Sequence, residues 1–246
     1  MPFRQHAPSL MNARRVIYSN PSRLAYKDGV GFFNTLAFHG VFFGSPFAQS
    51  NHFRWFESLE DWNDFKEEDQ EEEKYYVKKN CYGRSQTQRS LELLPKYWRQ
   101  RKAWNDIFNK SRPPTVEELY AWLVSKENGH SKFHNIGPLT ALLICGDLVE
   151  AGIVPMPSSH ELGQLIFKVG KGAQQGMIML GLVSEGANEE DFCTAFSSLD
   201  TYIQSELEVE GKERMGYNVV MLEHTLCKMK RLTTNQISLE EIFSEI

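Results

Sequence analysis

The segment Leu139–Val149 constrains the fold more than any other part of this chain, because it is apolar on almost every face of a helix. Its sequence, LTALLICGDLV, contains one ionisable carboxylate, Asp147. A helix that is apolar all round has to be buried. The sequence therefore predicts a protein built around this helix, in which Asp147 needs a partner or a raised pKa. The alternative for Asp147 is a half-exposed position at the end of the helix.

A tight turn, Asn-Ile-Gly-Pro at residues 135–138, precedes this helix. Pro138 suits the first turn of a helix, where its missing N–H removes no hydrogen bond. Gly137 tolerates a positive φ and lets another backbone come close. The N–H groups of Gly137, Leu139 and Thr140 would then point outward at a helix N-terminus, which suits a phosphate. The alternative is an ordinary loop-to-helix junction that binds no ligand.

Residues 135–141 resemble the hairpin of the helix-hairpin-helix DNA glycosylase superfamily, usually written L-P-G-V-G-x-K-T-A. In that family, backbone N–H groups of the hairpin hold a DNA phosphate, and a catalytic aspartate follows at the start of the next helix. The resemblance covers roughly residues 133–170 and implies that Asn135, Gly137 and Thr140 contact DNA. Asn135 stands where the family has its first glycine, and asparagine can also adopt the left-handed backbone conformation.

Two positions depart from the family pattern. The Schiff-base lysine falls on Leu139, and the catalytic aspartate falls on Ser158. The usual lyase mechanism is therefore not expected, because the amine nucleophile and the carboxylate are both replaced. The chain is also similar to the glutamyl/putrescinyl-thymine pyrophosphorylase group, which pairs an I-G-P-x-x-A-x-x-x-x-x-D-L-like helix with a late E-x-x-L-C helix. The matching residues here are 136–148 and 223–227.

For an enzyme, the expected acid–base residues are Asp147, His160 and Glu223. His160 begins a helix at the place where the resembled family closes its pocket, and Glu223 lies on the late helix beside His224. A carboxylate at Asp147 or Glu223 would stabilise a developing sugar cation or activate water. The alternative for each residue is a structural role, and at most one of the neighbours Glu223 and His224 is expected to face a pocket.

Charge is distributed unevenly along the 246 residues, whose formal net charge is −5. Residues 74–112 carry 11 Lys and Arg against two acidic residues, a local net charge of +9. Nucleic-acid binding depends on such a local basic surface and not on the overall charge. The alternative is a solvated helix face that pairs with the acidic residues 57–73.

Basic and aromatic residues interleave over residues 96–104. This mixture suits phosphate contact combined with base stacking. It suits equally well an amphipathic helix whose arginine stems cover an aromatic core. The candidate phosphate-binding side chains are Lys96, Arg99, Arg101 and Lys102.

The chain is predicted to be mainly α-helical, a helical bundle with a helix-hairpin-helix-like element and little or no sheet. Residues 1–50 are predicted to be an irregular, aromatic-rich segment. Residues 51–246 are predicted to form a single helical domain, with a subdomain break near residues 112–114. Helices are predicted near residues 50–69, 86–110, 115–126, 160–169, 188–210, 219–232 and 238–246. Glycines between residues 170 and 181 indicate close helix packing or a loop.

Neither a cofactor nor a metal is expected, because the four cysteines at positions 81, 145, 193 and 227 are too widely spaced for a zinc site. Unpaired thiols favour a reducing compartment, and we expect an intracellular location in the nucleus or the cytoplasm. No apolar run approaches the ~18 residues of a membrane span. Residues 1–27 contain five basic residues and no acidic one, which suits either organelle targeting or a basic arm.

Two functions fit these patterns. The first is a DNA-binding, glycosylase-like protein that acts on or recognises an extruded, modified base. The second is a non-enzymatic helical module that binds nucleic acid or a protein partner through residues 74–112. The pattern at residues 133–160 favours the first function, and the replaced lysine and aspartate favour the second.

Overall fold

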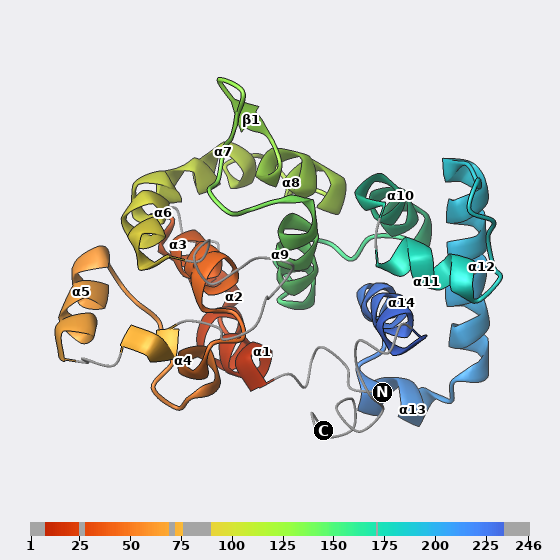
Figure 1. Ribbon diagram of the computed structural model, residues 1–246, viewed down its shortest axis with the longest axis horizontal. Helices are drawn as coiled ribbons and strands as arrows, with labels where there is room; N and C mark the ends of the chain where they lie inside the picture. The colour runs from red at the N-terminus through yellow and green to blue at the C-terminus, as the bar shows by residue number, and fades with distance from the viewer. Residues whose placement is uncertain (1–7, 25–27, 69–71, 76–89, 171, 234–246) are drawn as a thin grey trace. The chain divides into compact units, whose positions relative to one another are not determined.

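The computed structural model describes residues 8–24, 28–68, 72–75, 90–170 and 172–233, and these residues are mainly helical (Figure 1). The predicted mainly-α fold class is confirmed. The chain divides into an N-terminal unit, Pro8–Met156, and a C-terminal unit that begins at Pro157. The division lies well beyond residues 112–114, where the sequence predicts a break. Among the described residues, no helix combines the length and the apolar character needed to cross a membrane.

The N-terminal unit combines α-helices with π-helical and 3-10 turns and a small two-stranded sheet. Its described elements are α1 (Pro8–Ala13), the π-helix η2 (Arg14–Tyr18), α2 (Pro21–Leu24), α3 (Val30–Ala37), the π-helix η3 (Phe38–Phe42), α4 (Pro46–Gln49), α5 (Leu59–Glu68), η4 (Glu72–Tyr75), η6 (Leu91–Leu93), α6 (Leu94–Gln100), η7 (Arg101–Ala103), α7 (Trp104–Phe108), α8 (Val116–Leu123), β1 (Lys126–Glu127), β2 (His130–Ser131) and α9 (Pro138–Glu150). The C-terminal unit contains α10 (Ser159–Val169), α11 (Ala173–Met179), α12 (Glu189–Glu206), α13 (Val209–Met215) and α14 (Val219–Thr233).

Residues 8–49 are mostly helical and not irregular as their composition predicts. Three prolines that resemble loop signals are the first residues of helices, because α1, α2 and α4 begin at Pro8, Pro21 and Pro46. Proline is well tolerated there, since the first N–H groups of a helix have no intrahelical acceptor. The phenylalanines of this segment fill the core, and the following are at most 1% exposed: Phe32, Phe33, Phe38, Phe42 and Phe47.

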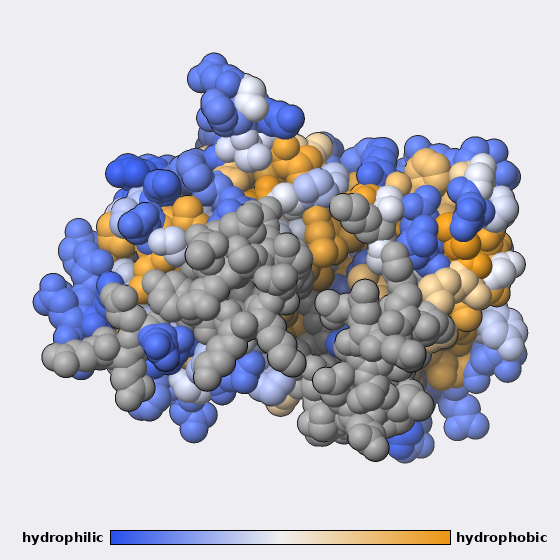
Figure 2. Space-filling view, viewed as in Figure 1, coloured by the Kyte–Doolittle hydropathy of each residue, from blue (hydrophilic) through white to orange (hydrophobic). Residues whose placement is uncertain are grey.

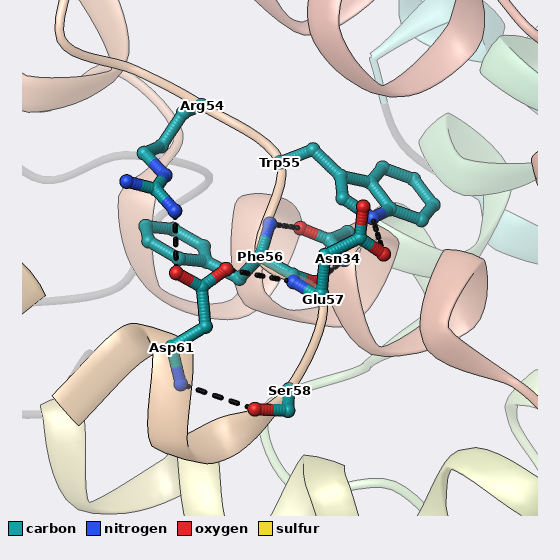
Figure 3. Close-up of polar contacts among 7 residues, drawn as sticks. All are labelled: Asn34, Arg54, Trp55, Phe56, Glu57, Ser58 and Asp61. Carbon is teal, nitrogen blue, oxygen red and sulfur yellow. Dashed lines mark hydrogen bonds and ion pairs between the residues drawn. The ribbon is translucent and has the colours of Figure 1, made fainter. Parts of the chain in front are cut away.

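The helix predicted from residue 50 begins only at Leu59, because the preceding segment makes polar contacts of its own (Figure 3). The buried Asn34 of α3 donates through Nδ2 to the carbonyl of Phe56 at 2.8 Å, and its Oδ1 accepts from the Phe56 N–H at 3.0 Å. Ser58 Oγ then accepts from the Asp61 N–H at 3.1 Å, as an N-cap side chain does. An extended segment held by α3 therefore replaces the first turns of the predicted helix.

α8 lies within the helix predicted near residues 115–126 and ends at Leu123. Thr115 and Glu118 form a capping box at its start. Hydrogen bonds from Arg112 lower the pKa of Glu118 to about 2. Asn128 and Gly129, with φ angles of 51° and 80°, form the turn of the hairpin between β1 and β2. Two positive φ angles match the tight turn that Asn-Gly favours, and the hairpin projects as a hydrophilic tip in Figure 2.

The helical region predicted over residues 86–110 consists of several short elements among the described residues 90–108. Pro95 lies in the first turn of α6, which directly follows the 3-10 turn η6, as expected of a proline that splits a helix. Two of the three aromatic residues over residues 96–104 face the core, since Tyr97 is 0% and Trp104 is 1% exposed, while Trp98 is half-buried beneath Arg101. The burial of Tyr97 and Trp104 favours the amphipathic interpretation of the basic–aromatic mixture and leaves neither ring available as a stacking surface. Residues 76–89 lie outside the described residues.

Two helix pairs, α10 with α12 and α11 with α14, build most of the C-terminal unit. Glycine permits both contacts: a Cβ on Gly163 would lie 3.3 Å from Cys193, and one on Gly176 would lie 2.3 Å from the carbonyl oxygen of Leu226. Close helix packing is therefore correct for Gly176, whereas Gly170 and Gly181 have positive φ angles and lie in turns after α10 and α11. Asn188 caps α12 as predicted. The helix predicted over residues 238–246 lies outside the described residues.

Candidate functional site

Tyr18, His39 and Asp147 form a buried polar cluster in the N-terminal unit, here called the buried triad. Asp147 Oδ2 lies 2.9 Å from His39 Nε2, and the two side chains are 1% and 0% exposed. The hydroxyl oxygen of Tyr18 lies 3.2 Å from the same imidazole nitrogen. Asp147 is therefore not a half-exposed helix end. Its need for a partner is met by His39, which the sequence analysis does not single out.

Two π-helices hold members of the buried triad. Tyr18 is the last residue of η2, and His39 lies in η3, while Asp147 belongs to α9. π-helical turns are rare and frequently mark functional sites. Phe43 lies parallel to the imidazole, with ring planes 8° apart, and Phe38 meets it edge-on. In such apolar surroundings, electrostatic interactions between the three polar groups are stronger than they are in water.

One sequence signal could have identified His39. It is the only ionisable residue in the apolar stretch of residues 30–47, and Asp147 is the only acidic or basic residue in the apolar helix Leu139–Val149. Two lone ionisable groups on two buried helices satisfy each other most simply by pairing, because each would otherwise be desolvated without compensation.

The turn before α9 has a left-handed residue at Asn135, with a φ of 60°. The sequence analysis allows a positive φ at Gly137, but this residue is extended, with φ −96° and ψ 179°. Pro138 occupies the first turn of α9 as predicted, and the N-cap residue Gly137 has no side chain with which to cap this helix. The side chain of Thr140 is buried, so only its backbone N–H can serve a ligand.

The four basic residues predicted to bind nucleic acid lie on α6 and η7, in the same unit as the turn. Arg99 and Lys102 are exposed, and Lys96 is half-buried. Arg101 is held against the fold, because its guanidinium carbon lies 3.8 Å from the centre of the Trp98 ring and its Nη1 donates to the Trp98 carbonyl at 2.7 Å. Arg99 and Lys102 are thus the more accessible cations.

His160 and Glu223 belong to the C-terminal unit and occupy different places in it. His160 lines an open groove of about 510 Å³. The other lining residues all come from α12 and carry hydroxyl groups: Thr194, Ser197, Ser198, Thr201 and Tyr202. Glu223 is 5% exposed on α14, and its Oε2 lies 3.4 Å from His224 Nε2. The predicted acid–base residues therefore do not share one unit, because Asp147 lies in the N-terminal unit.

Ser158, one of the two positions that depart from the resembled family, is the N-cap of α10. Its hydroxyl accepts from the Glu161 N–H at 3.2 Å, and the Glu161 carboxylate accepts from the Ser158 N–H at 2.7 Å. The hydrogen bonds that the Glu161 carboxylate accepts from the Ser158 N–H and the Ser158 hydroxyl lower its pKa. The neighbouring Ser159, which the sequence alone offers equally well as a cap, is instead the first residue of the helix.

Ser159 takes part in a second polar cluster, centred on the buried Asp200, that sequence reasoning missed. Its hydroxyl donates to the carboxylate of Asp200, which is 3% exposed. The same carboxylate accepts from Gln204 Nε2 at 2.9 Å and from the Tyr217 hydroxyl at 2.7 Å. Burial, together with the hydrogen bond to Asp200, raises the pKa of Tyr217. Asp200 thus ties α10, α12 and the segment after α13 together.

We expect Ser158→Ala to lower the free energy of unfolding of the C-terminal unit by about 1 kcal/mol, because it removes the N-cap acceptor of α10. Urea unfolding followed by circular dichroism at 222 nm measures this change, and Ser158→Asn, which keeps a capping oxygen, is the control. The pKa of Glu161 is lower in the folded state than in the unfolded state. The ionised Glu161 carboxylate therefore stabilises the fold at pH values above its unfolded-state pKa, and this stabilisation is lost as the pH falls through the folded-state pKa. An Ala variant as stable as the wild type at neutral pH would contradict the assignment.

Cysteine and metal chemistry find little support in the described part of the chain. Cys145 and Cys193 are buried thiols that form no disulfide. Burial raises the pKa of Cys145, which keeps the thiol protonated and unreactive. Among the described residues, no group of three His, Cys, Asp or Glu side chains could hold a metal ion.

The candidate site consists of the Asn135–Thr140 turn and the buried triad, which share α9, together with the exposed cations of α6 and η7 in the same unit. Comparisons of the chain with protein-family models, with curated proteins and with solved structures find no match.

Proposed function

We propose that this chain is a DNA-binding, glycosylase-like protein that recognises or processes an extruded base. The observation that supports the proposal is the organisation of α9. A turn with a left-handed residue lies at its start, where Gly137 provides no capping side chain, and a buried carboxylate with an imidazole partner lies near its end. Amides at a helix N-terminus suit a phosphate, because the helix dipole and the unpaired N–H groups both favour negative charge.

The spacing along α9 suggests a separate role for each end of the helix. Asp147 lies nine residues after Pro138, which corresponds to about 13 Å along a helix. This distance spans roughly four base steps of a DNA strand. The turn would therefore anchor the strand at a phosphate while a nucleotide further along presents its base. Such phosphate contacts fix the register of a protein on DNA and carry no sequence information.

The proposed chemistry differs from that of a lyase. Leu139 stands in place of the amine nucleophile, and Ser158 is occupied as the cap of α10. A covalent Schiff-base route is therefore not proposed. Asp147 would instead stabilise positive charge that develops on the sugar as the glycosidic bond breaks, with His39 holding the carboxylate in place. Extrusion of the base from the duplex would have to precede this step.

Gly137→Asp is expected to abolish most DNA binding without unfolding the protein. The backbone angles of Gly137 are those of an N-cap residue, so an aspartate there would cap α9 and keep or slightly raise its stability. The same carboxylate would occupy and repel the phosphate position, which we expect to weaken binding by about 10–100-fold. Fluorescence anisotropy with single-stranded, duplex and modified-thymine duplex probes measures the affinity across a salt series.

Gly186→Asp is the matched control, because it introduces the same charge in open space, with no other atom within 4 Å of its Cβ and no positive φ. Equal affinity of the Gly137→Asp and Gly186→Asp variants would remove the turn from the proposal. If the wild type bound none of the probes across the salt series, the proposed function itself would be wrong.

One observation favours the second candidate, a non-enzymatic nucleic-acid-binding module. His39 and Asp147 are each only 2% exposed, so a substrate could reach them only after the fold opens. An assay of base release from the modified-thymine duplex separates the two candidates. Base release by the wild type but not by Asp147→Asn, with DNA affinity retained, would support the enzyme. Binding without base release in both proteins would support the module.

A further inference from the structure

The backbone that leads into the Asn135–Thr140 turn is held by side chains of α6. The hydroxyl of Tyr97 donates to the carbonyl of His134 at 2.7 Å. Gln100 Nε2, three residues further along α6, donates to the carbonyl of Lys132 at 2.6 Å. Residues three apart share one face of a helix. One face of α6 therefore fixes two carbonyl groups directly before the left-handed Asn135.

The position of Tyr97 depends on the π-helix η3. A Cβ on Gly40 would lie 2.1 Å from the Tyr97 hydroxyl oxygen, so only glycine leaves room for this side chain. Gly40 directly follows His39, whose imidazole contacts Asp147. The same π-turn therefore supports both the buried triad and the tyrosine that holds the turn.

The remaining surface of α6 and η7 is cationic. Arg99 and Lys102 are exposed, and Lys96 is half-buried, whereas Tyr97 is 0% exposed. The helix that holds the turn thus also carries the charges that a phosphate backbone would meet. The hydrogen bonds from Tyr97 and Gln100 hold the backbone before the turn in the absence of any ligand. Such preorganisation strengthens binding, since the ordering cost is not paid on association.

We propose that Tyr97 and Gln100 are positioning residues that hold the Asn135–Thr140 turn in its phosphate-binding geometry, and that α6 joins the turn and its exposed cations into one contact surface for a nucleic-acid backbone. The inference rests on the proposed function. Neither residue touches the ligand: each acts by holding a backbone carbonyl, so its effect is transmitted through the turn.

The test is DNA binding by fluorescence anisotropy with a duplex probe, across a salt series, for the wild type, Tyr97→Phe, Gly137→Asp and the double variant. Tyr97→Phe removes only the hydroxyl and is expected to weaken binding about 3–10-fold, the equivalent of one hydrogen bond. The salt dependence should stay the same, because no cation is lost. In the Gly137→Asp background, where the turn is already blocked, Tyr97→Phe should have no further effect.

Two matched variants accompany this cycle. Tyr202→Phe removes a hydroxyl from a tyrosine that is 61% exposed in the C-terminal unit, and it should leave affinity unchanged. The double substitution of Arg99 and Lys102 by glutamine should instead lower the slope of log affinity against log salt by about 2, because two phosphate contacts would be lost. Gln100→Leu should behave as Tyr97→Phe does.

Hydrogen exchange provides a readout that does not depend on DNA. The amides of residues 135–140 should exchange faster in Tyr97→Phe than in the wild type, while those of α8 stay protected. Unchanged exchange at the turn would overturn the inference. Wild-type DNA affinity in Tyr97→Phe would also overturn it, as would an equal loss of affinity from this substitution in the wild-type and Gly137→Asp backgrounds. The proposed function would survive these results. Absence of DNA binding by the wild type would overturn both.

Discussion

His39→Ala and Asp147→Ala should each lower the free energy of unfolding of the N-terminal unit by about 3–5 kcal/mol. The two groups lie 2.9 Å apart with at most 1% exposure, so either substitution leaves the other group buried without the partner that compensates its desolvation. Removal of one member of a buried pair lowers the free energy of unfolding by more than the net contribution of the intact pair, because the remaining polar group cannot return to water. Tyr18→Phe, which removes one hydroxyl, should cost about 1 kcal/mol.

Tryptophan fluorescence during urea unfolding is the appropriate measurement, because all five tryptophans lie between residues 55 and 122, within the N-terminal unit. The double variant His39→Leu/Asp147→Ala roughly conserves the buried volume and removes both polar groups. It should be more stable than the sum of the losses measured in the single variants His39→Leu and Asp147→Ala predicts, with a coupling energy of about 2 kcal/mol or more. Strictly additive losses of less than about 1 kcal/mol each would show that the pair contributes little.

Gly176→Ala should destabilise the C-terminal unit by about 1–3 kcal/mol or more. The added Cβ would lie 2.3 Å from the carbonyl oxygen of Leu226, so α11 and α14 would have to move apart. A backbone carbonyl cannot rotate away as a side chain can, and separation of the two helices would open space around their other contacts. The cost therefore includes both strain and lost packing.

Gly211→Ala is the control, because it makes the same change within α13, where no other atom lies within 4 Å of the new Cβ. Alanine has the higher helix propensity, so this variant should be more stable by about 0.5–1 kcal/mol. Circular dichroism at 222 nm during urea unfolding compares the two variants with the wild type. If Gly176→Ala were as stable as Gly211→Ala, the close approach of α11 and α14 would be disproved.

Signals that act within a few residues were readable from the sequence. Thr115 with Glu118, and Asn188 before α12, each satisfy helix N–H groups a single turn away, so their effect does not depend on the rest of the fold. The continuous apolar character of Leu139–Val149 likewise required burial wherever the helix was placed.

Where a sequence signal was compatible with two local structures, only tertiary contacts decided between them. Proline occurs both in loops and at helix starts, and only the burial of an apolar residue in each first turn, Leu10, Leu24 and Phe47, favours helices there. Either serine of the pair Ser158-Ser159 could cap α10. The second one is instead engaged by the buried Asp200 of α12.

The sequence by itself determined the mainly helical class, several helix starts, the burial of α9 and the need of Asp147 for a partner. Only the tertiary structure decided that the partner is His39, that Tyr97 and Gln100 hold the backbone before Asn135, and that His160 and Glu223 belong to a different unit from Asp147. The physical reason is the range of the interactions. Caps and periodicity depend on neighbours within a helical turn, whereas the partner of a buried group is set by which distant helices pack together, and local propensity carries no information about that packing.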